Sequence, residues 1–166
     1  MNFFGAGSSV LERRDNLTKV GRLNSLPAHH PIIWGQRLGK PECPYMRRWA
    51  LDFKLFSIRL HHWYASDDQR YTHDHPWDFI CVILKGGYMD VTEQGEELMN
   101  TWWMAKRKAE HKHIVKVLPG GCWSLLLTGR AKRRWGFWVN GKFIEQRRYF
   151  FRFGQHPCEQ PSRDSV

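Results

Sequence analysis

From Arg48 onward, short apolar runs alternate with clusters of turn residues. Apolar and polar side chains largely alternate over residues 49–63, which is typical of a half-buried strand or of a bent pair of strands. Residues 79–84 form a continuous apolar run, and Lys-Gly-Gly follows as a turn. Further strands are predicted at 88–92, 99–108, 113–118, 123–128, 134–139 and 143–151, with hairpin turns at 119–121 and 140–141. Strands at this short spacing predict an all-β antiparallel sandwich or barrel.

The first 46 residues differ from the rest because glycines and prolines interrupt them repeatedly. They predict an irregular, partly helical N-terminal arm with short helices near 10–18 and around 31–38. We therefore expect an arm over residues 1–46 and a barrel domain over 47–153. A polar tail at 154–166 follows. The arm would pack over the barrel or over a second subunit, which makes a homodimer an expectation.

The net positive charge comes from one part of the chain. Residues 1–100 hold 12 basic and 12 acidic residues, whereas residues 101–166 hold 14 basic and 4 acidic ones and so carry the whole net charge of +10. Such a field favours an anionic partner, either a small molecule or nucleic acid, although a solvated basic face is the alternative. The basic residues of one expected exposed loop are the candidate anion contacts: Arg130, Lys132, Arg133 and Arg134.

Several classes of protein are excluded or disfavoured. No apolar run approaches the roughly 18 residues of a membrane span, and no secretory signal is readable at the start. We therefore expect a cytoplasmic protein with its four cysteines reduced. The cysteines form no CxxC pair, so a cysteine-built zinc site is unexpected. P-loop, dinucleotide-binding and α/β-hydrolase motifs are missing from the sequence.

Two His-x-His pairs are the sharpest chemical signal. Residues i and i+2 of a strand point to the same face, so His73 and His75 can reach one metal ion. His111 and His113 repeat this arrangement at the start of a later strand. Two strands could thus supply a three-histidine site with open positions. His113 is preferred as the third ligand because it leads directly into a strand, but His111 has the same parity and remains the alternative.

The pattern around these histidines resembles the cupin family. That family's first motif reads HxH, three or four residues, Glu, six residues and Gly. Here His73 and His75 are followed at the right distance by Gly86 or Gly87, but Phe79 or Ile80 stands in the place of the glutamate. The proline and glycine that precede the family's third histidine are missing too. Further similarity to small, poorly characterised cupin-like proteins lies in 73–79, 85–88, 125–129 and 134–137.

The resemblance implies a jelly-roll barrel, or double-stranded β-helix, with a divalent transition metal at its centre. Three neutral histidines leave the ion dipositive and able to bind an anionic or thiolate substrate. Fe(II) is the leading ion, as in thiol-dioxygenase-like cupins, and Zn, Ni or Mn would fit the same ligands. Phe79 shares the parity of His73 and His75, so that side of the site should be apolar.

Candidate substrate contacts surround the predicted site. Arg107 has the parity of His111 and His113, so it could enter the barrel mouth and hold a carboxylate or phosphate. Arg59 and Arg70 are further cationic candidates, and Trp77 and Phe79 are aromatic ones. We expect a metal-binding cupin-like protein that binds or acts on a small anionic molecule, with iron(II)-dependent dioxygenase chemistry as the leading enzymatic option. The alternative is a non-catalytic binder of nucleotides or nucleic acid through the basic C-terminal part.

Overall fold

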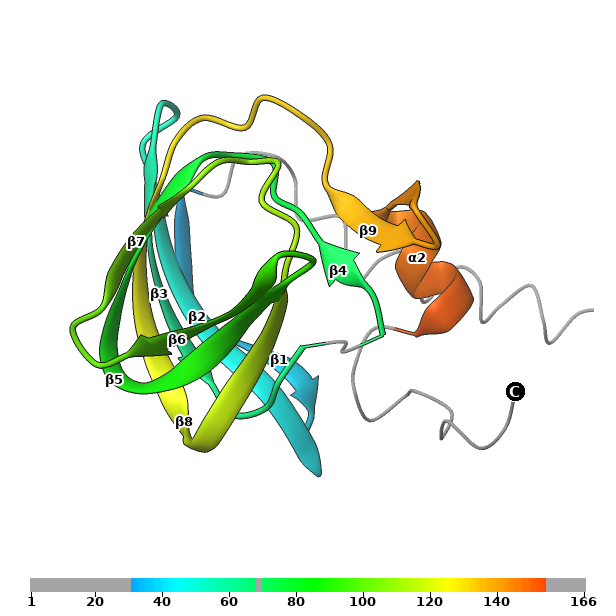
Figure 1. The fold of residues 1–166 in the computed structure, drawn as a ribbon. Coiled ribbons are helices and arrows are strands. Elements are labelled where there is room, and N and C mark those ends of the chain that lie inside the picture. Colours follow the sequence, from blue (N-terminus) through cyan, green and yellow to red (C-terminus); the bar gives the residue numbers. More distant parts are fainter. Residues whose placement is uncertain (1–30, 68–69, 155–166) are drawn as a thin grey trace, which may run out of the picture. The chain divides into compact units, whose positions relative to one another are not determined.

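The computed structural model describes residues 31–67 and 70–154 (Figure 1). All described residues belong to one unit of the chain. The helix predicted near residues 10–18 lies outside the described residues. The sheet begins at Ile32, inside the segment that the sequence analysis assigned to the arm.

The described fold is all-β, as predicted, apart from one C-terminal helix that was not expected. Seven antiparallel strands form the large sheet, in the order β1-β2-β3-β8-β5-β6 with β7 also paired to β5, and Figure 1 shows how it curves. These strands are β1 (Ile32–Lys40), β2 (Cys43–Asp52), β3 (Ser57–Trp63), β5 (Phe79–Thr92), β6 (Gly95–Asn100), β7 (Met104–Arg107) and β8 (Ile114–Thr128). A small sheet has the order β10-β9-β4, with β4 (Thr72–His73), β9 (Gly136–Val139) and β10 (Lys142–Glu145), and α2 (Gln146–Phe153) ends the described chain.

One face of the large sheet is buried, and the strand period of two decides which residues line it. Along β3, buried Ser57 and His61 alternate with exposed Ile58. Ser57 and Phe79 both lie opposite Thr128 in the register of the sheet. The core on this face consists of Phe79, Cys81, Ile83, Tyr88, Met99, Ala105, Val115, Cys122 and Leu126. Burying a side chain such as Ile83 contributes about 1.5–3 kcal/mol, so this layer stabilises the barrel.

Two glycine-containing segments that read as turns are bends inside long strands. The hairpin predicted at 119–121 was wrong, because β8 runs unbroken from Ile114 to Thr128. β5 likewise continues through Gly86, which has a φ of 72°. A Cβ atom at Gly86 would overlap the carbonyl oxygen of Gly121 on β8. Glycine here permits a close approach of two bending strands, a role that the sequence does not distinguish from a turn.

Three other element predictions were wrong. The expected helix around residues 31–38 is strand β1, because it pairs with β2 along its length. The expected strand at 99–108 divides into β6 and β7 around Trp102, which has a φ of 69°. The expected strand at 143–151 ends after Glu145 and becomes α2. Tyr149 and Phe153 are four residues apart, so a helix places both on one face, where Tyr149 stacks on Phe137 with ring centroids 3.7 Å apart.

The cysteines follow the sequence expectation only in part. Cys81 and Cys122 are free thiols buried in the core. Cys43 is disulfide-bonded, so the expectation that all four cysteines are reduced was wrong. Among the described residues, α2 is the one helix, and it is neither long nor apolar enough to cross a bilayer.

Candidate metal centre

The two His-x-His motifs lie side by side although forty residues separate them. His73 is the last residue of β4, and His113 stands directly before β8. The backbone N–H of His73 donates to the carbonyl of His113 at 2.9 Å, and the reverse bond is also 2.9 Å. The N–H of His75 donates to the carbonyl of Ala109 at 2.9 Å. These bonds fix the register that brings the imidazoles together.

His73, His75 and His113, called here the histidine cluster, point their rings at one another. The Nε2 atoms of His75 and His113 are 2.9 Å apart, and the ring centroids of His73 and His113 are 4.7 Å apart. One nitrogen from each ring lies within 4.8 Å of the other two. Imidazole nitrogens bound at about 2.1 Å to one ion lie roughly 3–3.4 Å from each other. The donor set therefore fits a divalent transition metal with little rearrangement.

Two buried carboxylates hold the outer nitrogens of this cluster. Nδ1 of His73 lies 3.2 Å from Asp67, and Nδ1 of His113 lies 2.5 Å from Asp90. A proton on each Nδ1 leaves Nε2 as the electron-pair donor, which is how outer carboxylates orient histidine ligands in metal sites. Neither aspartate was singled out from the sequence.

The electrostatics favour neutral imidazoles at His73 and His75 and a charged carboxylate at Asp90. Burial is the main cause that lowers the pKa of His73 and His75 well below 6.5, and the neighbouring imidazoles add to the effect. Burial alone would raise the pKa of Asp90, but hydrogen bonds from His111 and His113 outweigh it and hold that pKa far below its usual value. Metal binding needs neutral imidazole, so the cluster is prepared for it at neutral pH.

Arg107 lies behind the cluster. Its guanidinium donates to Asp90 at 3.1 and 3.2 Å and also to Glu97. His111, the alternative ligand, has its Nε2 atom 3.0 Å from the same Asp90 carboxylate. Asp90, His111 and His113 are also close enough to hold an ion. Because Arg107 and two imidazoles already balance Asp90, we interpret this second group as the support of His113.

Two aromatic candidates flank His75. Trp77 stacks on its imidazole with ring centroids 5.2 Å apart, and Phe79 meets it edge-on at 4.7 Å. The Arg59 guanidinium lies 5.4 Å from the centre of the Trp77 ring. The position of Phe79 beside His75 agrees with its strand parity. The Arg59 guanidinium contacts Trp77, and Trp77 in turn stacks on His75.

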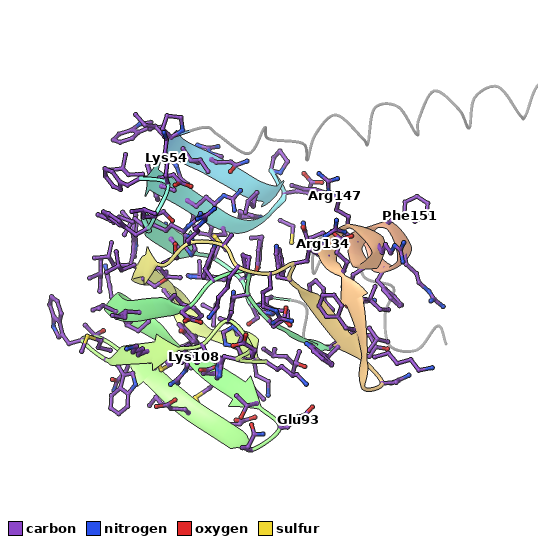
Figure 2. All side chains as sticks on the ribbon, turned by 90° about the horizontal axis from the view of Figure 1, so that it is seen from above. Lys54, Glu93, Lys108, Arg134, Arg147 and Phe151 are labelled. Atoms are coloured by element: carbon purple, nitrogen blue, oxygen red, sulfur yellow. The ribbon has the colours of Figure 1, made fainter. Side chains whose placement is uncertain are left out.

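The remaining cationic candidates lie elsewhere. Arg70 donates to the carbonyl of Phe153 at 3.0 Å and so fastens α2. In the predicted anion-binding loop, Lys132 pairs with Asp78 at 2.8 Å, and Arg133 pairs with fully buried Asp74 at 2.8 Å. Arg130 and Arg134 are exposed, and Figure 2 places Arg134 on the side of α2. Two of the four basic residues of this loop therefore form ion pairs with other parts of the fold.

Asp67 and Asp90 could not be found from the sequence by motif. Asp90 lies 23 residues before His113, and Asp67 lies six before His73. The available signal at Asp90 is a lone acid among the largely apolar residues 88–91 of a strand. Which imidazole it meets depends on the pairing of β5 with β8, which the sequence leaves open.

No protein-family model and no curated protein sequence matches this chain. Solved structures with a similar fold include an RmlC-like cupin protein from Ralstonia eutropha, with a TM-score of 0.49 and 8% identity over 70% of this chain and 78% of that one. A cupin-superfamily sugar phosphate isomerase from Silicibacter pomeroyi has a TM-score of 0.43 and 17% identity over 54% of this chain. The structure of Fe(II) HppE gives 0.47 and 11% over 62% of this chain. This chain spans 64% and 58% of the last two proteins' lengths.

Proposed function

We propose that this protein is a metal-dependent cupin that binds, and acts on, a small anionic molecule at an ion held by His73, His75 and His113. One observation carries the proposal: two of the three imidazoles have Nδ1 on a buried carboxylate, while Nε2 of His113 faces Nε2 of His75. A solitary buried histidine would need neither the carboxylates nor the convergence.

The residues around the cluster have distinct tasks in this proposal. Asp67 and Asp90 fix the tautomers of His73 and His113 through the Nδ1 contacts. Trp77 and Phe79 cover His75 and keep water from that side of the site. Three neutral ligands leave the full charge of a divalent ion, and we propose Fe(II), which would supply redox chemistry of the dioxygenase type when bound.

Metal analysis tests the proposal. Protein purified from metal-replete medium should hold about one divalent transition metal per chain, and a His73→Ala, His75→Ala double variant should hold almost none. His62→Ala is the matched control, because His62 stacks on Trp123 on the other side of β3. Equal metal content in the parent and the double variant would refute the proposal.

The pH dependence sharpens this test. Because burial lowers the pKa of His73 and His75, protons compete with metal only below the ordinary imidazole pKa of about 6.5. We expect metal affinity to hold between pH 8 and 6.5 and to fall on further acidification. A steady loss that begins above pH 7 would show that the ligands are not these buried imidazoles.

A second function, polyanion binding, is supported by α2. The helix exposes Arg147, Arg148 and Arg152 beside Phe151, which is 80% exposed, and Figure 2 labels Arg147 and Phe151 on this helix. Cations around an exposed ring are typical of single-strand binding. Titration with a single-stranded oligonucleotide at several salt concentrations tests it, with Arg147→Ser, Arg148→Ser expected to flatten the salt dependence. An unchanged slope would exclude this face.

A further inference from the structure

The buried face of the large sheet carries a second group of ionisable side chains. This group lies on β2 and β3, whereas Asp90 lies on β5. Arg48 on β2 and Arg59 on β3 belong to this face, and His61 lies between them in the register because it is opposite Arg48. We call Arg48, Arg59 and His61 the arginine group. Arg59 connects it to the histidine cluster through Trp77, which stacks on His75.

Each guanidinium is anchored by one nitrogen. Nε of Arg48 donates to the side-chain oxygen of Gln36 at 2.7 Å, and Nε of Arg59 donates to Ser57 at 3.0 Å. Ser57 is itself held by Thr128 at 2.7 Å. Among residues 31–67 and 70–154, no carboxylate forms an ion pair with either arginine, and their terminal nitrogens have no hydrogen-bond partner. Two forks of N–H donors are therefore fixed in place and still available.

His61 gives an independent sign of a ligand. Its side chain is only 9% exposed, and neither ring nitrogen has a hydrogen-bond partner in the described part of the chain. An unsatisfied buried polar group costs about 1–3 kcal/mol, so such groups call for an explanation. Burial and the charges of both arginines lower the pKa of His61 to about 3, so the ring is neutral and keeps one N–H to donate.

The charges of the two arginines also oppose each other. Burial is the main cause that lowers the pKa of Arg48, and the positive charge of Arg59 lowers it further. Burial lowers the pKa of Arg59 as well, and Asp52 offsets this only in part. Two half-buried cations without an ion pair are costly, and a bound dianion would relieve both costs at once.

We propose that Arg48, Arg59 and His61 bind the phosphate group of a small phosphorylated molecule whose other end reaches the metal. This inference rests on the proposed function and names its substrate class. A phosphate has enough oxygens for two guanidinium forks and one imidazole N–H, and its charge of nearly −2 matches two arginines. Arg107, the anion contact expected from the sequence, is instead engaged by Asp90 and Glu97.

Inorganic phosphate is the probe for the test, and the arginine Nε–H signals of ¹⁵N-labelled protein are the readout. Phosphate should shift the signals of Arg48 and Arg59 in the unmodified protein, and acetate should bind more weakly. Arg48→Gln and Arg59→Gln should each weaken phosphate binding about tenfold or more, since each removes charge-assisted hydrogen bonds. Arg37→Gln is the matched control, because Arg37 is exposed on neighbouring β1.

The outcomes separate this inference from the proposed function. If phosphate leaves both signals of the unmodified protein unmoved, or if Arg37→Gln weakens binding as much, the inference is overturned even where a variant fails to fold. Acetate binding as tight as phosphate would overturn the phosphate class. His75→Ala should lose metal and keep phosphate affinity within about threefold. A parent that binds phosphate here but no metal refutes the proposed function alone.

Discussion

The histidine cluster and the arginine group both lie on the buried side of the barrel, yet their charges are balanced differently. Behind His113, the carboxylate of Asp90 is 3% exposed and is matched by Arg107 and His111. Around Arg48 and Arg59, no carboxylate forms an ion pair in the described residues. In the first region, side chains of the protein bind the Asp90 carboxylate, and the Nε2 atoms of His75 and His113 face each other. The second region has no such ion pair among the described residues, and in our proposal a bound phosphate supplies the negative charge.

Removing Asp90 should have the largest effect. Asp90→Asn takes away the charge that Arg107, His111 and His113 share, and leaves a half-buried cation without its main partner. We expect a loss of about 3–5 kcal/mol in the free energy of unfolding, measured in urea. Glu97→Gln removes the more exposed partner of Arg107 and should cost less than about 1 kcal/mol. Equal costs would mean that Asp90 does not organise this region.

In the basic loop of residues 130–134, we expect an intermediate loss in the free energy of unfolding at one position, Arg133. Arg133→Ser leaves the fully buried Asp74 without its cation, although Gly136 and Trp138 still donate to it. A loss of about 2–3 kcal/mol is expected in thermal or urea unfolding. Arg130→Ser, in the exposed part of the loop, should change stability by less than about 0.5 kcal/mol. Indistinguishable variants would show that the loop is merely solvated.

His61 should make stability depend on pH. The folded protein holds the pKa of His61 at about 3, whereas the unfolded chain has an ordinary value of about 6.5. The unfolded state therefore binds the proton first, and stability falls as the pH falls from 6.5 toward 3. Between pH 6.5 and 5.0 the parent should lose about 1.5 kcal/mol more than His61→Gln. Parallel curves for the two proteins would contradict the burial of a neutral His61.

Replacing an arginine of the second region should have the smallest effect and the opposite sign. Arg48→Met removes a half-buried cation that lacks an ion pair, so the free energy of unfolding should rise by about 0.5–1 kcal/mol. Arg37→Met on the exposed side of β1 should change it by less than about 0.5 kcal/mol. A clear loss in Arg48→Met would show that the arginine is already balanced within the fold.

Predictions from the sequence succeeded where the deciding interactions are local. Strand parity placed His73 and His75 on one side and Phe79 beside them, because a period of two needs no knowledge of the partner strand. Arg107 contacts Asp90, the carboxylate partner of His113. The carboxylates of Asp90 and Glu97 reach Arg107 because β5 pairs with both β6 and β7. The local sequence pattern does not specify these strand pairings.

Glycines and aromatic residues misled for a related reason. Gly86 and Gly121 mark a bend shared by two strands, and a bend and a turn need the same permissive backbone. The aromatic residues after 142 suit a strand by propensity, but Tyr149 finds its partner Phe137 only from a helix. Such choices are made by tertiary packing.

X-ray absorption of the metal-loaded protein tests the central claim most directly. The histidine cluster predicts that the extended fine structure beyond the absorption edge of the bound ion fits close to three imidazole nitrogens. Light oxygen or nitrogen atoms should complete the coordination shell, and no sulfur should be present. His113→Ala should reduce the imidazole count and the metal occupancy together. A loaded parent that shows at most one imidazole, or sulfur in the shell, would contradict the assignment of His73, His75 and His113 as the metal ligands.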